Sequence, residues 1–246
     1  MASLYLHPEL SDADAVVGSR VTVTGDEARH AVSVARVRIG ERIAVGDGAG
    51  LVVWGEVVSA EPTALTIEVD DARVEPTPRP ELWLAQALAK GDRDELAIQA
   101  ATELGVSGVI PWAAERSISR WDGPKVAKGR DRWAAIVREA SKQAIRPRVP
   151  EVGAHSTTKQ LIGLPGKLVV LEPDARDALV DLEFTAGDAE AVILVVGPEG
   201  GISPRELELF ADAGAALVHL GPEVLRTSTA GPAALAVLAA RLGRWA

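Results

Sequence analysis

The fold class of this 246-residue chain is decided by one stretch, Ala191-Val192-Ile193-Leu194-Val195-Val196-Gly197-Pro198-Glu199-Gly200-Gly201. Its apolar, mostly β-branched first half predicts a strand that is buried on both faces, as in a parallel sheet. The glycines that follow break the strand and let the bare main chain approach a ligand closely. The stretch is not a P-loop, because no Gly-Lys-Ser/Thr follows it, and it lacks the glycine spacing of a dinucleotide site. The residues alone therefore indicate a ligand loop at the carboxyl end of a parallel strand.

A helix and a second strand follow this loop. Ser203-Pro204-Arg205-Glu206 has the pattern of a capping box with proline at the first helical position. It predicts a helix that runs to about Gly214. Ala215 to Leu220 is expected to form a second buried strand, which Gly221-Pro222 ends.

A polar stretch then opens the last helix. Ser228 or Thr229 is expected to cap this helix, and Leu235, Leu238 and Leu242 recur along it at helical spacing. Three loops, each of them close to a strand end or a helix start, thus lie close together in the sequence. We expect them to line one pocket.

The same alternation of strands and helices extends upstream to residue 82. The expected strands are 82–88, 106–111 and 167–171, and the expected helices are 92–104 and 128–145. In the first of these helices Leu96, Ala100 and Leu104 share one face. The alternation predicts an α/β fold, a parallel sheet covered by helices on both faces.

The first 75 residues have a different pattern. Short strand candidates are separated by Gly, Asp and Pro turns, and they are 21–23, 42–45, 51–54 and 65–69. A short helix is expected between Gly25 and Val34. Many short strands in so short a segment suggest a small β-barrel. Three prolines within residues 76–80 mark a linker between this barrel and the rest of the chain.

Composition excludes several classes of protein. The chain has no cysteine, which excludes disulfides and thiolate metal sites, and its four histidines are scattered without a carboxylate cluster, so no metal site is expected. Its apolar runs are too short to span a bilayer and no signal peptide is evident, which is compatible with a cytoplasmic location.

The net charge of −9 argues mildly against nucleic acid, but the basic residues are not evenly spread. Residues 120–148 hold nine basic and three acidic residues. Such a cluster is either a solvated helix face or an RNA contact. Trp121 and Trp133 lie within it; stacking on bases is one role open to them, and core packing is the expected role of Trp133.

Taken together, these segments resemble the ribosomal small-subunit methyltransferase E family (RsmE), which belongs to the SPOUT methyltransferases. The resemblance covers nearly the whole chain. It rests on the three C-terminal loops and on upstream segments that match in order, which are 87–93, 101–106, 115–117, 138–143 and 146–150. One residue departs from the family pattern: Ser228 stands where the family usually has glutamate.

The resemblance implies two domains and a linker. Residues 1–75 would form a PUA-like RNA-binding β-barrel, residues 76–80 the proline-rich linker, and residues 81–246 the SPOUT methyltransferase domain. The SPOUT domain would carry a deep trefoil knot near its C-terminus, an exception to the rule against threaded chains. Pattern alone would predict an ordinary doubly wound sheet.

The resemblance also implies a cofactor and a reaction. The cofactor is S-adenosylmethionine (SAM), and the reaction is methylation of N3 of a uridine, position 1498, in 16S ribosomal RNA. By matching position, the cofactor-binding residues are Leu171, Glu172, Gly197, Pro198, Glu199, Gly200, Gly201, Leu220, Gly221, Pro222, Val224, Leu225, Arg226 and Thr227. Arg226 is the first candidate for stabilising a uridine anion, and Glu199 and Glu103 are candidates for the proton acceptor.

Further residues are expected to hold the RNA. They are Arg29, His30, Arg36, Arg38, Lys90, Arg93, Arg116 and Arg146. Arg36 and Arg38 would share a face if they lay in a strand. The family also implies a homodimer in which the partner chain completes the active site. The implied substrate partner is the small ribosomal subunit or its 16S RNA. Two alternatives stay open: a non-catalytic ribosome assembly factor, suggested by Ser228, and a methyltransferase acting on transfer RNA or a ribose 2′-hydroxyl.

Overall fold

The computed structural model describes residues 4–183 and 190–245 of the chain. The chain divides into two compact units. The first unit comprises Met1–Thr77 and Ser141–Val149, and the second comprises Pro78–Ala140 and Pro150–Ala246. No helix among the described residues is long and apolar enough to cross a membrane.

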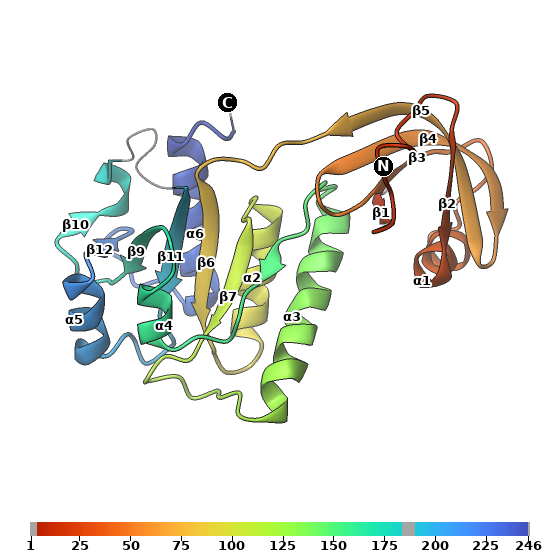
Figure 1. Ribbon diagram of the computed structural model, residues 1–246. Coiled ribbons are helices and arrows are strands. Elements are labelled where there is room, and N and C mark those ends of the chain that lie inside the picture. Colours follow the sequence, from red (N-terminus) through yellow and green to blue (C-terminus); the bar gives the residue numbers. More distant parts are fainter. Residues whose placement is uncertain (1–3, 184–189, 246) are drawn as a thin grey trace. The chain divides into compact units, whose positions relative to one another are not determined.

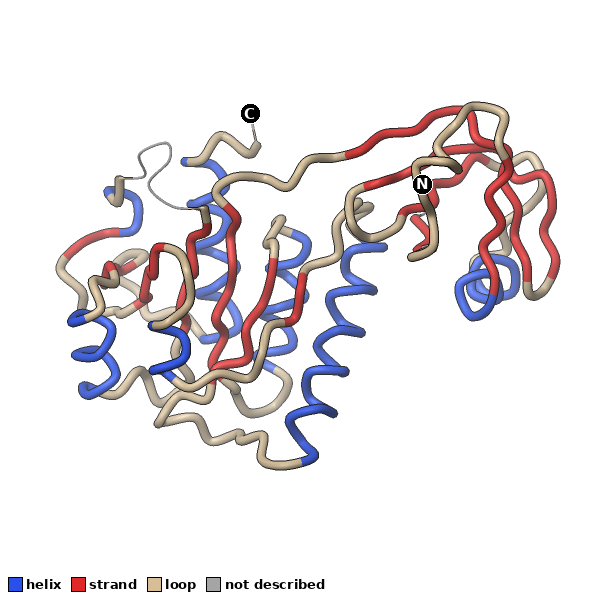
Figure 2. The backbone as a smooth tube through the Cα atoms, viewed as in Figure 1, coloured by secondary structure: helices blue, strands red, loops and turns tan. Residues whose placement is uncertain are grey.

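The first unit is built on a five-stranded sheet, coloured red in Figure 2, with the strand order β1-β3-β4-β5-β2. The strands are β1 (Leu4–Leu6), β2 (Arg20–Thr24), β3 (Arg42–Gly46), β4 (Leu51–Glu61) and β5 (Ala64–Val74). All neighbours are antiparallel except β1 and β3, which are parallel. Two register shifts between β4 and β5 bend this long hairpin, because each bulge adds twist locally.

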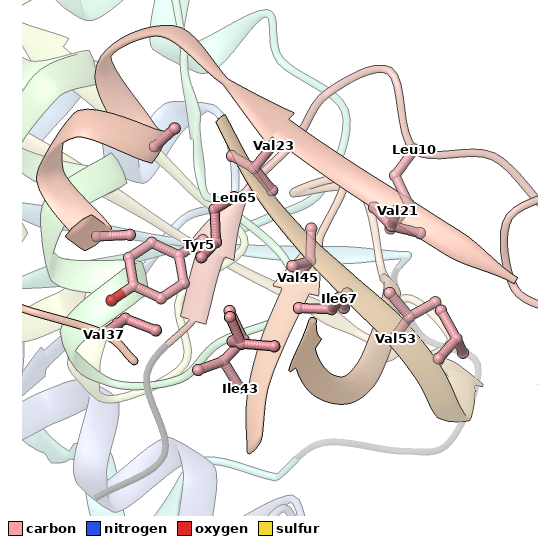
Figure 3. Packing of buried hydrophobic residues seen from close by; sticks show 14 of the residues in the cluster. Tyr5, Leu10, Val21, Val23, Val37, Ile43, Val45, Val53, Leu65 and Ile67 are labelled. Carbon is pink, nitrogen blue, oxygen red and sulfur yellow. The ribbon is translucent and has the colours of Figure 1, made fainter. Parts of the chain in front are cut away.

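Alternating apolar residues of these strands form the core of the first unit. Val21 and Val23 are buried, whereas the residues between and beside them are exposed, as expected for a sheet with one covered face. Figure 3 shows the cluster, in which Tyr5 and Val37 lie near each other and Val45 and Ile67 lie at the centre. A short helix, α1 (Gly25–Arg29), continues into one π-helical turn, η1 (His30–Val34), and contributes Ala28 and Ala31 to the core.

The segment after this turn corrects one expectation. Arg36 and Arg38 do not lie in a strand, so they do not share a strand face. Arg36 has a φ of 58°, in the left-handed region, and the chain bends there before it enters β3. The bend buries Val37 between the two exposed arginines.

The second unit contains a seven-stranded sheet in which every neighbouring pair is parallel. Its order is β10-β12-β9-β11-β6-β7-β8. The strands are β6 (Glu81–Ala87), β7 (Gly108–Trp112), β8 (Glu151–Val152), β9 (Lys167–Leu171), β10 (Asp177–Ala178), β11 (Ala191–Val196) and β12 (Ala216–His219). The apolar run 191–196, which forms β11, therefore lies at the centre of the sheet.

Helices cover both faces of this sheet (Figure 1). On one face, α4 (Thr158–Ile162) and α5 (Pro204–Asp212) pack through Leu161 and Phe210 onto Ala85 and Val195. On the other face, α6 (Thr227–Arg241) packs on β6 and β11 and on α2 (Arg93–Glu103). The long α3 (Pro124–Gln143) precedes β8, and a 3₁₀ turn, η2 (Leu179–Asp181), follows β10. The predicted α/β class is confirmed; the knot, which the sheet order alone does not test, stays a prediction.

The face of α2 that carries Leu96 and Ala100 is not its buried face, which is formed by Asp94, Ala97, Ile98, Ala101 and Thr102; Leu96 is 57% exposed. One expectation about α6 is wrong: Ser228 and Thr229 do not cap the helix, which begins at Thr227 with Arg226 as its N-cap residue. The hydroxyl of Thr227 makes a tertiary contact instead, with the carbonyl of Gly197.

Candidate functional site

A cavity of about 460 Å³ opens at the carboxyl ends of three neighbouring strands of the second unit. Leu171 ends β9, Val196 ends β11 and His219 ends β12, and all three line it. In open α/β sheets, ligands bind beyond the carboxyl ends of the strands. The volume of this cavity is in the range of small-molecule sites. The three loops that the sequence predicts to share a pocket therefore meet around one cavity.

Most of the predicted cofactor residues line this cavity. They are Leu171, Glu172, Gly197, Pro198, Glu199, Gly201, Leu220, Gly221, Val224, Leu225, Arg226 and Thr227. The other two, Gly200 and Pro222, lie in the same loops but are not among the lining residues. The cavity thus offers a ligand both apolar walls and exposed glycine backbone. The role of each residue in cofactor binding stays a prediction.

Glu199 fastens the loop after β11 to the loop before α2. Its carboxylate accepts hydrogen bonds from the backbone N–H of Lys90, at 3.1 Å, and from the guanidinium of Arg93, at 2.9 Å. Partial burial acts to raise the pKa of Glu199, but hydrogen bonds from its own N–H, from Lys90 and from Arg93 outweigh it and lower the pKa below the ordinary value. An ionised, hydrogen-bonded carboxylate is a weak base. The geometry therefore favours a structural tie over the predicted role as proton acceptor.

A second set of polar contacts holds the far side of the same loop. Ser203 and Glu206 form the predicted capping box of α5, with the Glu206 N–H donating to the Ser203 hydroxyl at 3.2 Å. The Ser203 hydroxyl in turn donates to Glu115 at 2.7 Å, and the Thr158 hydroxyl donates to buried Glu206 at 2.7 Å. Arg116 donates to the carbonyl of Gly200 at 3.2 Å. The segment 115–117, which resembles the family pattern, thus supports the loop from outside the cavity.

Arg226 is placed differently from Arg93, which also lines the cavity but pairs with Glu199. It lines the cavity, its side chain is exposed, and it makes no ion pair with any residue in the described ranges 4–183 and 190–245. Its guanidinium is therefore available to a ligand. Thr227, the next residue, is 6% exposed, and its hydroxyl donates to the carbonyl of Gly197 at 2.7 Å.

Several cavity residues were not predicted. They are Pro173, Val196, Ile202, Val218, His219, Glu223 and Ala230, together with Arg93, for which an RNA contact was predicted. Most of them adjoin a predicted residue, and the rule that ligands lie beyond the carboxyl ends of parallel strands would have found Val196, Val218 and His219. Glu103, in contrast, is exposed at the end of α2 and does not line the cavity.

The predicted RNA-binding residues are distributed over both units. Arg29, which pairs with Asp26 at 2.7 Å, and His30, Arg36 and Arg38 are exposed on the first unit. Arg146 is half-buried there. Lys90, Arg93 and Arg116 lie beside the loop at Glu199 and Gly200. Their contact with RNA stays a prediction.

The basic segment 120–148 is only partly available to a ligand. Arg130 donates to the carbonyls of Val152 and Gly153, Arg132 pairs with Glu95 on α2, and Arg148 donates to the carbonyl of Glu75. Arg120, Lys125 and Lys128 are exposed. The accessible positive charge is thus concentrated at the start of α3.

The two tryptophans of this segment have separate environments. Trp133 is 1% exposed, which confirms its expected packing role and removes it as a stacking platform for bases. Trp121 is half-buried, and its ring meets that of Trp133 edge to face at 5.4 Å. It also lies against Gly129 of α3, where a Cβ would be 2.5 Å from the indole.

A larger cavity, of about 820 Å³, lies at the opposite end of the strands from the first cavity. Residues at or near the amino ends of the strands line it, among them Trp83 of β6 and Ile193 of β11. None of the predicted cofactor or RNA residues is among the residues that line it. The smaller cavity is therefore the candidate functional site. Within the described ranges, no group of histidine and acidic side chains is arranged to hold a metal ion.

Comparisons with known proteins identify the family of this chain. Residues 75–239 match a family model described as RNA methyltransferase domain, and residues 23–70 match one described as RNA methyltransferase PUA domain. The ribosomal RNA small subunit methyltransferase E of Mycobacterium bovis is 40% identical over 252 aligned positions, which cover 100% of this chain and 94% of that protein. The Bacillus subtilis enzyme of the same name is 30% identical and covers 85% of each chain.

Solved structures show the same relationship. The methyltransferase E of Neisseria gonorrhoeae, bound to S-adenosyl methionine, superposes with a TM-score of 0.86 at 28% identity, over 98% of both chains. A Legionella pneumophila methyltransferase with bound SAM gives 0.84 at 27% identity, also over 98% of both chains. A relative is 40% identical over the full length of this chain, and a family model matches residues 75–239, so this chain belongs to the ribosomal RNA small subunit methyltransferase E family.

Proposed function

We propose that the protein transfers the methyl group of SAM to N3 of a uridine in 16S ribosomal RNA, at the position numbered 1498. The observation that carries this proposal is the convergence of three loops around one cavity that the exposed residue Arg226 lines. Family membership supports the reaction, and the names of the relatives supply the substrate.

The residues of the cavity fit SAM. The faces of an adenine need apolar walls, which Leu220 and Leu225 provide, and its edge needs backbone groups, which the glycines of the loops expose. The carboxylates of Glu172 and Glu223 are available to the positive charge of the ligand. SAM supplies an electrophilic methyl group when it is bound and leaves as S-adenosylhomocysteine. The proton of N3 passes to solvent water, and this chain contributes positioning and electrostatics.

The chain must make the uridine nitrogen nucleophilic, because N3 carries a proton at neutral pH. The guanidinium of Arg226, when placed beside a uracil oxygen, stabilises the anion and so lowers the pKa of the N3–H group. The ties from Glu199 to Lys90 and Arg93 hold the loop that faces this cation. Positioning of the nitrogen in line with the methyl group supplies much of the rate.

We also propose a role for each domain. Residues 1–75 would bind and orient the RNA, residues 76–80 would link the domains, and residues 81–246 would carry the catalysis. The match of residues 23–70 to a PUA domain supports the first role. The small ribosomal subunit, or its RNA, is the partner, and because the substrate is ribosomal the protein would act in the cytoplasm.

We infer that the protein acts as a homodimer. Exposed apolar side chains support this: Leu96 on α2 is 57% exposed and Val224, beside the cavity, is 77% exposed. Sedimentation equilibrium tests the inference. A monomer at micromolar concentration, with full methylation activity, would refute it.

The test of the function is methylation of 30S subunits, and of deproteinised 16S RNA, with isotope-labelled SAM. We expect label in 3-methyluridine, identified by mass spectrometry of the nucleosides. Label in transfer RNA or on a ribose would support the alternative methyltransferases. RNA binding without any methylation would support the assembly factor, for which the only observation is Ser228.

The role of Arg226 is tested by Arg226→Ala. We expect kcat to fall about 100-fold, as for the loss of one group that stabilises a developing charge. Stability should not change, since the side chain is exposed and makes no ion pair within the described ranges. Full activity of the variant would remove Arg226 from the mechanism.

A further inference from the structure

Gln86 is a fully buried polar residue at the carboxyl end of β6, and it does not line the cavity. Its side-chain Nε2 donates to the hydroxyl of Thr227 at 2.8 Å and to the carbonyl of Ala87 at 3.2 Å. The contact with Thr227 joins residues 141 positions apart in the sequence. A buried polar side chain in the middle of an apolar sheet needs a reason.

The direction of these hydrogen bonds is fixed by counting protons. The carbonyl of Gly197 can only accept, so the single proton of the Thr227 hydroxyl is directed at it, at 2.7 Å. The hydroxyl must then accept from Gln86, and only the NH₂ group of the amide can donate. The result is one continuous chain from Gln86 through Thr227 to Gly197, which we call the Gln86 relay.

The relay connects the bases of two of the three loops that line the cavity. Gly197 is the first residue after β11, and Thr227 is the first residue of α6, directly after Arg226. The strand end has little freedom, since a Cβ on Gly197 would lie 2.7 Å from Ile202. The relay therefore fixes the distance between the loop at Gly197 and the segment that carries Arg226.

The relay has a cost in stability. The other amide atom of Gln86, Oε1, is buried and has no hydrogen-bond partner among the described residues. A buried acceptor without a partner destabilises the folded state, and an apolar side chain of similar shape would remove that penalty. The presence of glutamine is thus better explained by what its donor group positions than by stability.

We propose that Gln86 is a positioning residue for the methyl-transfer site: through Thr227 it sets the spacing of the Gly197 loop and Arg226, and so the shape of the cofactor cavity. This inference rests on the proposed function. Gln86 itself touches neither the cofactor nor the RNA, and it acts only through the relay.

The experiment compares Gln86→Leu, Thr227→Val and Thr227→Ser with the wild-type protein. The matched control is Thr102→Val, which removes the hydroxyl of another buried threonine, one that donates to the Ile98 carbonyl and is not part of the relay. The readouts are the Kd for S-adenosylhomocysteine by calorimetry, backbone amide exchange at residues 197–201, and the urea midpoint without ligand.

We expect Gln86→Leu and Thr227→Val to weaken S-adenosylhomocysteine binding about tenfold, the equivalent of one hydrogen bond. Amide exchange at 197–201 should become faster, while the urea midpoint of Gln86→Leu stays the same or rises. Thr227→Ser, which keeps the hydroxyl, should restore both properties, and Thr102→Val should not alter them.

The proposal is overturned if Gln86→Leu and Thr227→Val bind the ligand as tightly as Thr102→Val does. If the wild-type protein itself does not bind S-adenosylhomocysteine, the proposed function fails instead. The amide exchange then decides the relay by itself: faster exchange at 197–201 in the two variants supports it, and unchanged exchange overturns it.

Discussion

The carboxylate of Glu199 ties the loop after β11 to the start of α2. It binds the Lys90 N–H and the Arg93 guanidinium across two loops, and its side chain is 22% exposed. Because its pKa is lowered in the folded protein, the ionised form is the one that the fold favours. This has a consequence for the pH dependence of stability.

A carboxylate with a lowered folded pKa contributes stability above its unfolded pKa and loses that contribution as the pH falls through the folded value. For Glu199 the loss begins near the ordinary value of 4.5 and is complete below the lowered one. We predict that Glu199→Gln lowers the free energy of unfolding by about 1 kcal/mol at neutral pH and by nothing in strong acid. Urea unfolding over that pH range measures it.

The control for this prediction is Glu103→Gln. Glu103 is exposed at the end of α2, and its side chain accepts a hydrogen bond from Gln99, one turn earlier, at 3.3 Å. Its replacement should change stability little at any pH. If both variants follow the same pH profile, Glu199 is not the group that the loops depend on.

At the scale of single elements, the start of α5 shows how a local signal and a tertiary contact coincide. Ser203 caps the helix and also donates to Glu115 at 2.7 Å. We predict that Ser203→Ala destabilises the protein by about 1 kcal/mol, the usual loss for an N-cap. Glu208→Ala, at an exposed position of the same helix, should be neutral in the same thermal unfolding experiment. A neutral Ser203→Ala would mean that the cap is dispensable.

The hairpin of β4 and β5 depends on a glycine. A Cβ at Gly55 would lie 2.2 Å from the backbone carbonyl oxygen of Glu68, which cannot move without breaking the ladder. We predict that Gly55→Ala lowers stability by about 3 kcal/mol, at the upper end for overpacking. Calorimetry should show the loss in the first unit. Gly163→Ala, where a Cβ would make only ordinary contacts from 3.6 Å, serves as the control.

Strands that are buried on both faces of the sheet could be predicted from the sequence. β9 and β11 have the predicted bounds because a central parallel strand is apolar throughout. The face of α2 could not be predicted by counting large residues. This helix packs on α6, its buried residues include the small Ala97 and Ala101, and Leu96 is left in solvent.

The start of α6 was mispredicted for a related reason. Ser228 and Thr229 have the residue type of a cap, but the hydroxyl that matters is that of Thr227, which is committed to Gly197 and Gln86. Local capping rules consider only the neighbouring backbone. These rules cannot predict a contact between residues 141 positions apart. They also do not predict the left-handed backbone of Arg36, which prevents a strand at that residue.

For the whole molecule, charge distribution matters more than the net charge of −9. Several basic residues of segment 120–148 are bound to other parts of the protein, so the exposed Lys125 and Lys128 are the better candidates for phosphate contacts. We predict that Lys125→Glu and Lys128→Glu weaken binding to 16S RNA. The slope of log K against log salt should fall by about 0.7 to 0.9 for each phosphate that a variant no longer neutralises.

Lys159→Glu controls for the change in net charge. Lys159 is exposed on α4, outside the basic segment, and its reversal alters the total charge by the same amount. Its salt slope should equal that of the wild-type protein. Equal slopes for all three variants would show that the start of α3 does not contact RNA.

The position of β11 also has a consequence for how the protein is made. Its neighbours in the sheet, β6 and β9, leave the ribosome earlier and cannot pair with each other in the native register while β11 is missing. A growing chain therefore presents two open apolar edges until its last quarter has been synthesised, and such edges recruit other strands. Pairing of β11 with β6 joins strands that are far apart in the sequence, and such pairing is slow, so it is expected to limit the folding rate. The nascent protein should therefore depend on chaperones more than its modest size suggests.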